Sequence, residues 1–78
     1  MIPTQLRPIV VDSSLLASAA YDAGESVLQL EFRDGAIYRY FAVPAAVYDD
    51  LLAADSKGSY FNKQIRGSFR HTRLRRPQ

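Results

Sequence analysis

The chain is 78 residues long, with 47% apolar residues, 23% charged residues and no cysteine. This length suits a single domain, and the lack of cysteine excludes disulfides, thiolate nucleophiles and cysteine-ligated metals. The net charge is only +2, but residues 1–56 carry eight acids and three bases, whereas residues 57–78 carry seven bases and no acid; this asymmetry indicates either an anionic partner or a solvated basic tail.

The first part of the chain predicts an arm followed by one strand. Residues 1–8 are expected to be irregular, because Pro3 and Pro8 oppose strand pairing. The Asp-Ser-Ser run at 12–14 favours a turn, because these side chains bond nearby backbone amides. The short apolar run at 15–21 then predicts a strand, since turn signals flank it on both sides.

The clearest secondary-structure signal is a hairpin in the middle of the chain. Over residues 27–33, leucine or phenylalanine alternates with polar residues, which is typical of a half-buried strand. Asp34-Gly35 follows, and this dipeptide frequently joins two antiparallel strands. We therefore expect residues 36–43 to form the next strand.

The length of the hairpin loop decides which sheet face carries Tyr38 and Tyr40. A two-residue loop would place both tyrosines opposite polar side chains. A three-residue loop, with Gly35 left-handed, would pair them with Leu30 and Leu28. We favour the three-residue loop, because it puts two large aromatic rings on the apolar face of the sheet.

The second half of the chain predicts two short helices. Residues 44–54 carry an apolar stripe at helical spacing, and Pro44 suits the first helical position, where its missing N–H is harmless. A second helix is expected over residues 60–66, with Ser59 as its N-cap and a glycine directly after it. Residues 70–78 are expected to be a flexible basic tail.

These elements predict an α+β domain with a core at about residues 9–69. A three-stranded antiparallel meander is followed by two short helices packed on one sheet face, because a three-stranded sheet with both faces in water would be unstable. The outer face would carry Val27, Ile37 and Phe41. This modest apolar patch could be covered by the N-terminal arm or could form a dimer contact.

The sequence contains no recognisable catalytic constellation. The single histidine, His71, lies in the basic tail with nothing to orient it, and we expect it to be solvated. Asp49 and Asp50 are adjacent on a helix and so point in different directions. No cluster of His, Asp and Glu has metal-ligand spacing. We therefore expect no enzyme activity, no metal site and no cofactor.

The first candidate binding site is the start of the second helix. Such a start presents unpaired amides and a partial positive charge, which favour a phosphate. Lys57 and Ser59 lie at this start, and Lys63 and Arg66 share a helix face. The alternative is that the serines here only cap the helix.

A second candidate consists of Arg39 with Tyr38 and Tyr40. Exposed aromatic rings beside a cation can stack on the bases of a single strand. Rings in an alternating strand are more often part of the core, so both interpretations stay open for the tyrosines.

The order and spacing of several short motifs resemble the KTSC domain, which occurs at the C-terminus of some lysyl-tRNA synthetases and as small bacterial proteins. The resemblance covers about residues 9–69 and centres on the Tyr-x-Tyr pair at Tyr38 and Tyr40. A second motif reads Ser56-x-Gly58-x-Tyr60-Phe61-Asn62-x-x-Ile65-Arg66. The function of the family is not established, but its attachment to a tRNA synthetase implies RNA binding. The tail from Arg70 onward lies outside the family pattern.

We therefore expect a small non-catalytic module that binds nucleic acid, RNA rather than DNA. The alternative is a protein-interaction module that uses the outer apolar face or an edge of the sheet. No apolar run has the length of a membrane span, and the start does not resemble a secretory signal. We expect a cytoplasmic protein without a membrane partner, as a monomer or a weak homodimer.

Overall fold

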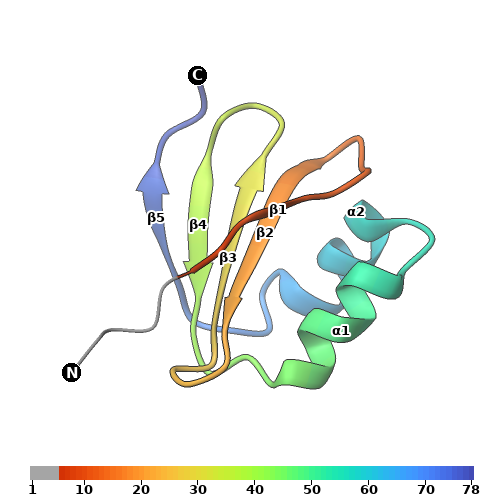
Figure 1. Ribbon diagram of the computed structural model, residues 1–78. Helices are drawn as coiled ribbons and strands as arrows, with labels where there is room; N and C mark the ends of the chain where they lie inside the picture. The colour runs from red at the N-terminus through yellow and green to blue at the C-terminus, as the bar shows by residue number, and fades with distance from the viewer. Residues whose placement is uncertain (1–5) are drawn as a thin grey trace.

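The protein folds as a five-stranded antiparallel sheet with helices packed against one of its faces (Figure 1). The computed structural model describes residues 6–78. The strands lie in the sheet in the same order as in the sequence. The helices come after the fourth strand and before the fifth in the sequence. The elements are β1 (Ile9–Val10), β2 (Leu16–Asp22), β3 (Val27–Phe32), β4 (Ile37–Tyr40), α1 (Ala45–Ala53), α2 (Lys57–Tyr60), the π-helix η1 (Phe61–Ile65) and β5 (His71–Arg75).

The predicted α+β class is confirmed, but the expectation of three strands was wrong. β2, β3 and β4 form the expected meander, and one further strand extends it on each side. β1 pairs only Ile9 and Val10 with β2, which is too short to leave an alternating pattern in the sequence. β5 is exposed along its whole length and contains two arginines, Arg73 and Arg75; its residues lack the alternating pattern that indicates a strand.

Residues 71–75, expected as part of a flexible tail, form β5 instead. β5 pairs with β4, so that His71 lies opposite Tyr40 and Arg73 lies opposite Tyr38. Figure 1 shows β5, in dark blue, running beside β4 at the edge of the sheet. Pairing with a strand from the middle of the chain fixes these basic residues against the sheet.

The C-terminal residues after β5 are tied to the β3–β4 hairpin. The backbone N–H of Gln78 donates to the carbonyl oxygen of Asp34 at 2.6 Å. The Arg75 guanidinium donates to the carbonyl oxygen of Gly35 at 2.7 Å and to the Glu31 carboxylate at 3.0 Å. The end of the chain therefore closes over the tip of this hairpin.

The three-residue hairpin loop is confirmed. Leu30 pairs with Tyr38 and Leu28 pairs with Tyr40, so the tyrosines share the apolar face with the leucines. Gly35 has a φ of +96°, in the left-handed region where a Cβ is unfavourable. This glycine sets the register and thereby the direction in which both tyrosines point.

Replacing Gly35 with alanine is expected to cost about 2 kcal/mol or more of unfolding free energy. Besides the positive φ, a Cβ at this position would lie 2.9 Å from Cγ and 3.2 Å from the backbone nitrogen of Gln78, so the C-terminal segment would have to move. Gly67→Ala is the matched control, because Gly67 has a φ of +79° but open space around its Cα. Urea unfolding measures both variants, and equal losses would contradict the role of the C-terminal contact.

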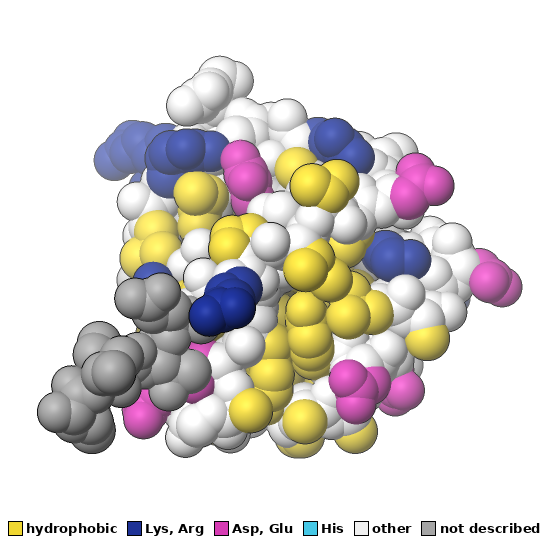
Figure 2. Space-filling model, viewed as in Figure 1, with side chains coloured by type: hydrophobic (Ala, Val, Ile, Leu, Met, Phe, Trp, Pro, Cys, Tyr) yellow, Lys and Arg dark blue, Asp and Glu magenta, His cyan; other side chains and the backbone are white. Residues whose placement is uncertain are grey.

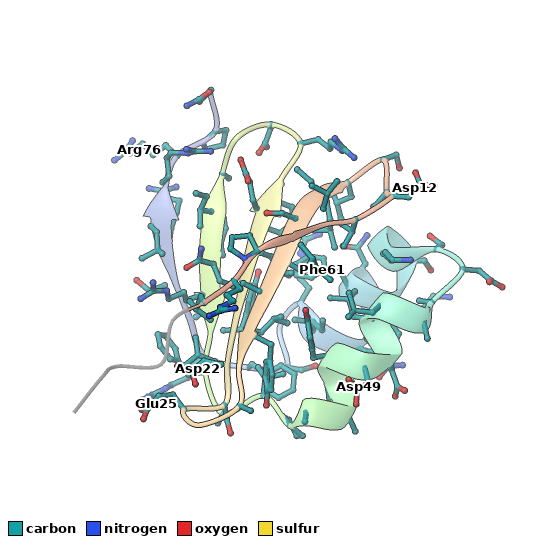
Figure 3. The ribbon with its side chains drawn as sticks, viewed as in Figure 1. Asp12, Asp22, Glu25, Asp49, Phe61 and Arg76 are labelled. Atoms are coloured by element: carbon teal, nitrogen blue, oxygen red, sulfur yellow. The ribbon has the colours of Figure 1, made fainter. Side chains whose placement is uncertain are left out.

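The core lies between the inner face of the sheet and the helices, as the prediction of two helices on one face requires. Figure 3 places Phe61 between the sheet and the helices. The buried side chains that meet there include Leu28, Leu30 and Tyr40 from the sheet and Leu51, Phe61 and Ile65 from the helices. The inner face is therefore the side on which both tyrosines lie.

The helix boundaries differ slightly from the expected ones. Pro44 is the N-cap of α1 rather than its first residue. The cap of α2 is Ser56, whose Oγ accepts the N–H of Ser59 at 3.2 Å, so the prediction of Ser59 as the cap was wrong. α2 leads directly into η1, where the N–H of Arg66 donates to the carbonyl oxygen of Phe61 at 2.8 Å. This five-residue spacing is that of a π-helix.

The segment before β1 crosses the outer face of the sheet (Figure 1). Leu6 lines a shallow hollow there together with Val27 and Phe41. Of the irregular arm expected over residues 1–8, the structure describes residues 6–8, which belong to no helix or strand. Leu6 therefore lies over part of the apolar patch expected on this face.

Candidate functional site

A pocket of about 380 Å³ opens between the inner face of the sheet and η1. One wall of the pocket is aromatic, and its rim carries polar side chains. The aromatic wall consists of Phe32, Tyr38, Tyr40 and Phe61. The polar rim consists of Asp34, Asn62, Arg66 and His71. An apolar cavity of this size with a few converging polar groups is typical of small-ligand sites.

The aromatic wall is held together by ring contacts. The rings of Tyr38 and Tyr40 stack with their centroids 6.3 Å apart and an interplanar angle of 24°. Phe61 meets Tyr40 edge-on at 5.8 Å and meets Phe32 edge-on at 5.2 Å. Such contacts favour one arrangement of the rings, so the wall is preformed.

The hydroxyl groups of Tyr38 and Tyr40 are available to a ligand. Tyr40 is only 4% exposed and lines the pocket. Within residues 6–78, neither hydroxyl has a hydrogen-bond partner, whereas that of Tyr21 donates to the Val43 carbonyl oxygen. No buried side-chain oxygen among the described residues lacks a partner, so the two unpaired hydroxyl oxygens are open to the pocket or to solvent. There they can bond a molecule that enters the pocket.

Tyr40 is expected to make stability depend on pH above pH 10. The pKa of Tyr40 is raised from 10.0 to about 12, mainly by burial and also by nearby Tyr38, while Arg66 opposes the rise. The folded state therefore holds the phenol proton more tightly than the unfolded chain does. The contribution of Tyr40 to the free energy of unfolding is complete below pH 10 and is lost as the pH rises towards 12. We expect a loss of about 1–2 kcal/mol, because water in the pocket screens part of the charge.

Urea unfolding across this pH range, in the wild type and in Tyr40→Phe, measures the effect. The readout is the difference between the two proteins, since other groups also titrate there. Stability curves that stay parallel up to pH 12 would contradict the assigned shift.

The π-helix η1 and its C-terminal end supply the cation and the amide on the rim. Asn62 lies within η1 and Arg66 directly follows it, and both line the pocket. Among the described residues the one ion pair joins Arg75 to Glu31, so the exposed guanidinium of Arg66 is available to an anion. Single π-turns occur frequently at functional sites.

His71 completes the rim from β5, although the sequence suggested a solvated tail residue. Its ring centroid lies 5.4 Å from that of Tyr40 and 5.7 Å from that of Tyr38. His71 is exposed, as expected, but the expectation of a flexible tail was wrong, because β5 has no apolar alternation that would have predicted a strand. The lone histidine was visible in the sequence, but nothing there placed it beside the tyrosines.

Further cations lie near the pocket along β5. Arg73 pairs with Tyr38, and directly paired residues share a sheet face. Arg70 precedes β5 and is exposed. In Figure 2, Lys and Arg side chains gather beside the C-terminal end of β5, with one acidic side chain next to them, and other acidic side chains lie near α1 and elsewhere. The cations at the end of β5 would attract an anionic partner to this edge of the sheet.

The structure brings three of the seven predicted site residues into one place. Tyr38, Tyr40 and Arg66 all line the pocket. Arg39 points to the opposite face, where its Nε donates to the side-chain oxygen of Gln29 at 2.8 Å. The two tyrosines and the arginine between them therefore face different sides of the sheet.

Lys57 lies in different surroundings from the pocket. Its ammonium donates to the Ala54 carbonyl oxygen at 3.1 Å, near the end of α1. It lines a separate small hollow together with Asp12 and Asp55, and Figure 3 shows Asp12 beside α2. The two carboxylates make this helix start a poor place for a phosphate.

Ser59 and Lys63 also lie outside the pocket lining. The N–H of Ser59 is already bonded to Ser56, so it is not available to a phosphate. Lys63 is exposed on η1, where it adds positive charge but contacts neither tyrosine ring. The predicted helix-start site therefore separates into residues with different environments.

Within residues 6–78, no three His, Asp or Glu side chains are grouped closely enough to hold a metal ion. In the same part of the chain, no helix is both long and apolar enough to span a membrane.

Comparison with known families gives one match over most of the chain. The family model of the KTSC domain matches residues 12–69. A KTSC domain protein from Yersinia pestis, known from a crystal structure, superposes with a TM-score of 0.87 at 30% identity, covering 91% of this chain and 100% of that one.

Similar sequences include both small proteins and part of a large enzyme. A protein from Tsukamurella paurometabola is 45% identical over 64 residues, which cover 82% of this chain and 96% of that protein. An uncharacterised protein from Stutzerimonas stutzeri is 45% identical over 58 residues, covering 74% and 82% of the two chains. A lysine–tRNA ligase from Nostoc punctiforme is 40% identical over 63 residues, which cover 81% of this chain but only 11% of the ligase.

Proposed function

The chain belongs to the KTSC domain family, and from this premise we propose that it is a non-catalytic cytoplasmic module that binds single-stranded RNA. In this proposal the aromatic pocket receives a base, and the cations of η1 and β5 bind the phosphates beside it. The observation that carries the proposal is the convergence of Tyr38, Tyr40 and Arg66 with His71 around one cavity.

The chemistry of the pocket supports a single strand as the ligand. Aromatic side chains that stack on unpaired bases contribute about 1–3 kcal/mol per base. Such a base is accessible only when the strand is not in a duplex. The hydroxyl groups of Tyr38 and Tyr40 can also bond a ribose 2′-OH, which distinguishes RNA from DNA. The occurrence of a similar segment in lysine–tRNA ligases agrees with an RNA partner.

Salt dependence tests the electrostatic part of the proposal. Arg66 lies on the pocket rim, Arg73 lies opposite Tyr38, and Arg70 and Arg76 flank β5; all four are exposed. If they neutralise about four phosphates of a single strand, log affinity should fall with log salt at a slope of about −3. Fluorescence anisotropy with labelled single-stranded RNA at about 50 and 200 mM salt measures this slope.

Duplex RNA and single-stranded DNA of the same sequence serve as comparison ligands. We expect the single-stranded RNA to bind most tightly. Absence of binding, or binding that does not change with salt, would defeat the proposal. Preference for the duplex would defeat the role of the pocket, because a stacked and paired base cannot enter it.

A protein partner is the second candidate function, and the open edge of β5 favours it. β5 pairs with β4 on one side only, so its other edge can accept an extended peptide or a second copy of the chain, as a weak homodimer would. This alternative predicts that Leu74→Lys, on β5, weakens partner binding, because a further charge on the open edge opposes strand pairing, while Arg66→Glu leaves it intact. The opposite ranking of the two variants would reject it.

A further inference from the structure

The pocket has opposite charges at its two ends. Arg66 and His71 lie at the Tyr40 end, because His71 pairs with Tyr40 and Arg66 acts on the Tyr40 phenol. Asp34 and Pro77 lie at the hairpin end, next to Ala36. The four residue-to-residue steps from Ala36 to Tyr40 span about 13 Å in an extended strand. The pocket is therefore long enough for a base together with its phosphate.

We propose that this pocket binds one guanine nucleotide of the single strand, with the phosphate at Arg66 and His71 and the N–H edge of the base at Asp34. The inference rests on the proposed RNA binding and names the nucleotide that the pocket selects. The cationic end of the pocket thus binds the phosphate, and the acidic end binds the base.

The cationic end fits a phosphate. Guanidinium groups bind phosphate oxygens through two parallel hydrogen bonds, and Arg66 has no carboxylate partner among the described residues. The Tyr40 hydroxyl lies on the same side and is protonated at neutral pH, which is far below its pKa of about 12. A neutral phenol can donate to an anion, which a phenolate could not do.

The middle of the pocket fits a flat ring. Tyr38 of β4, which lies between Ala36 and Tyr40, is half-buried there. Stacking on Tyr38 would be available to any of the four bases. The aromatic wall therefore gives affinity, and the choice between bases has to come from the polar group at the far end.

The acidic end favours guanine. One oxygen of Asp34 accepts the N–H of Ala36 at 3.0 Å, and its other oxygen has no partner within the described residues. A carboxylate only accepts hydrogen bonds. Guanine presents two adjacent N–H donors on its Watson–Crick edge, whereas adenine and cytosine place an acceptor beside their amino group. Placing such an acceptor against the carboxylate is unfavourable, and this selects against those bases.

The single histidine of the chain provides a direct readout. Its ring lies on the pocket rim, so the imidazole proton signals of His71 in NMR report occupancy. We expect GMP to shift these signals with at least about tenfold higher affinity than AMP or CMP, the discrimination typical of one good base contact. Ribose 5-phosphate should bind more weakly than GMP, because it lacks the ring.

Two variants separate the ends of the site. Asp34→Asn keeps an acceptor for the Ala36 N–H but removes the charge, so the ratio of GMP to AMP affinity should fall to about twofold or less. Arg66→Gln should weaken GMP and AMP by the same factor and leave guanosine, which has no phosphate, unchanged. Retained guanine preference in Asp34→Asn would overturn the assignment of the base edge.

The control with oligonucleotides distinguishes this inference from the proposed function. If single-stranded RNA binds with the expected salt slope but GMP and AMP shift His71 equally, or not at all, the guanine site is wrong and RNA binding stands. If neither RNA nor nucleotide binds, the proposed function fails first. A guanine preference in the His71 signals that Asp34→Asn removes supports both.

Discussion

Replacing Phe61 with alanine is expected to destabilise the domain by about 3–5 kcal/mol. Phe61 is 5% exposed and packs edge-on against Phe32 and Tyr40, so truncation leaves a cavity in the core and removes two aromatic contacts. A domain of this size has a total stability of only about 4–12 kcal/mol. The variant should therefore be partly unfolded near body temperature and should lose the wall of the pocket.

Urea and thermal unfolding followed by circular dichroism measure this loss. Phe61→Leu keeps most of the volume and should cost less than about 1.5 kcal/mol if the cavity dominates. Leu74→Ala is the surface control, because Leu74 is 49% exposed on β5, and it should change stability by no more than about 0.5 kcal/mol. A loss for Phe61→Ala as small as that of Leu74→Ala would contradict the central position of η1 in the core.

Charge reversal at Arg66 is expected to weaken single-stranded RNA binding by about tenfold or more, which corresponds to at least about 1.4 kcal/mol. Arg66→Glu removes the guanidinium from the pocket rim and puts a carboxylate where a phosphate would lie. Lys57→Glu is the matched control, since it changes the net charge by the same amount. It should lower affinity by less than about threefold, because Lys57 lies in a separate hollow with Asp12 and Asp55.

Anisotropy titrations at one fixed salt concentration compare the two variants, with circular dichroism to verify that each is folded. The difference between them removes the contribution of net charge, because both carry the same total. Equal losses would mean that overall charge attracts the RNA and that the pocket has no special part. A larger loss for Lys57→Glu would restore the helix start as the binding site.

The β3–β4 hairpin could be predicted from the local sequence pattern. The alternation in the strand over 27–33 and the Asp34-Gly35 turn were sufficient to predict the β3–β4 pairing. The preference for placing large rings on an apolar face then gave the correct register for Tyr38 and Tyr40. These features depend on residues within about ten positions of one another, so the sequence contains the information directly.

The residues of the candidate site could not be predicted from the local sequence pattern. Lys57 and Ser59 had the residue types of a phosphate-binding helix start, but the lysine bonds Ala54 and the serine amide bonds Ser56. His71 had no local signal at all. Its role on the pocket rim depends on pairing with Tyr40, 31 positions earlier in the chain.

The sequence by itself determined the α+β class, the central hairpin, the two helices and the face that carries the tyrosines, because periodicity and turn chemistry act over a few residues. Only the tertiary structure decided that the basic C-terminal third divides between the pocket and the rest of the surface. It did so by pairing β5 with β4, which sets His71 and Arg73 beside the tyrosines. The physical reason is that an exposed, charged edge strand is specified by its partner's free backbone groups rather than by its own side chains.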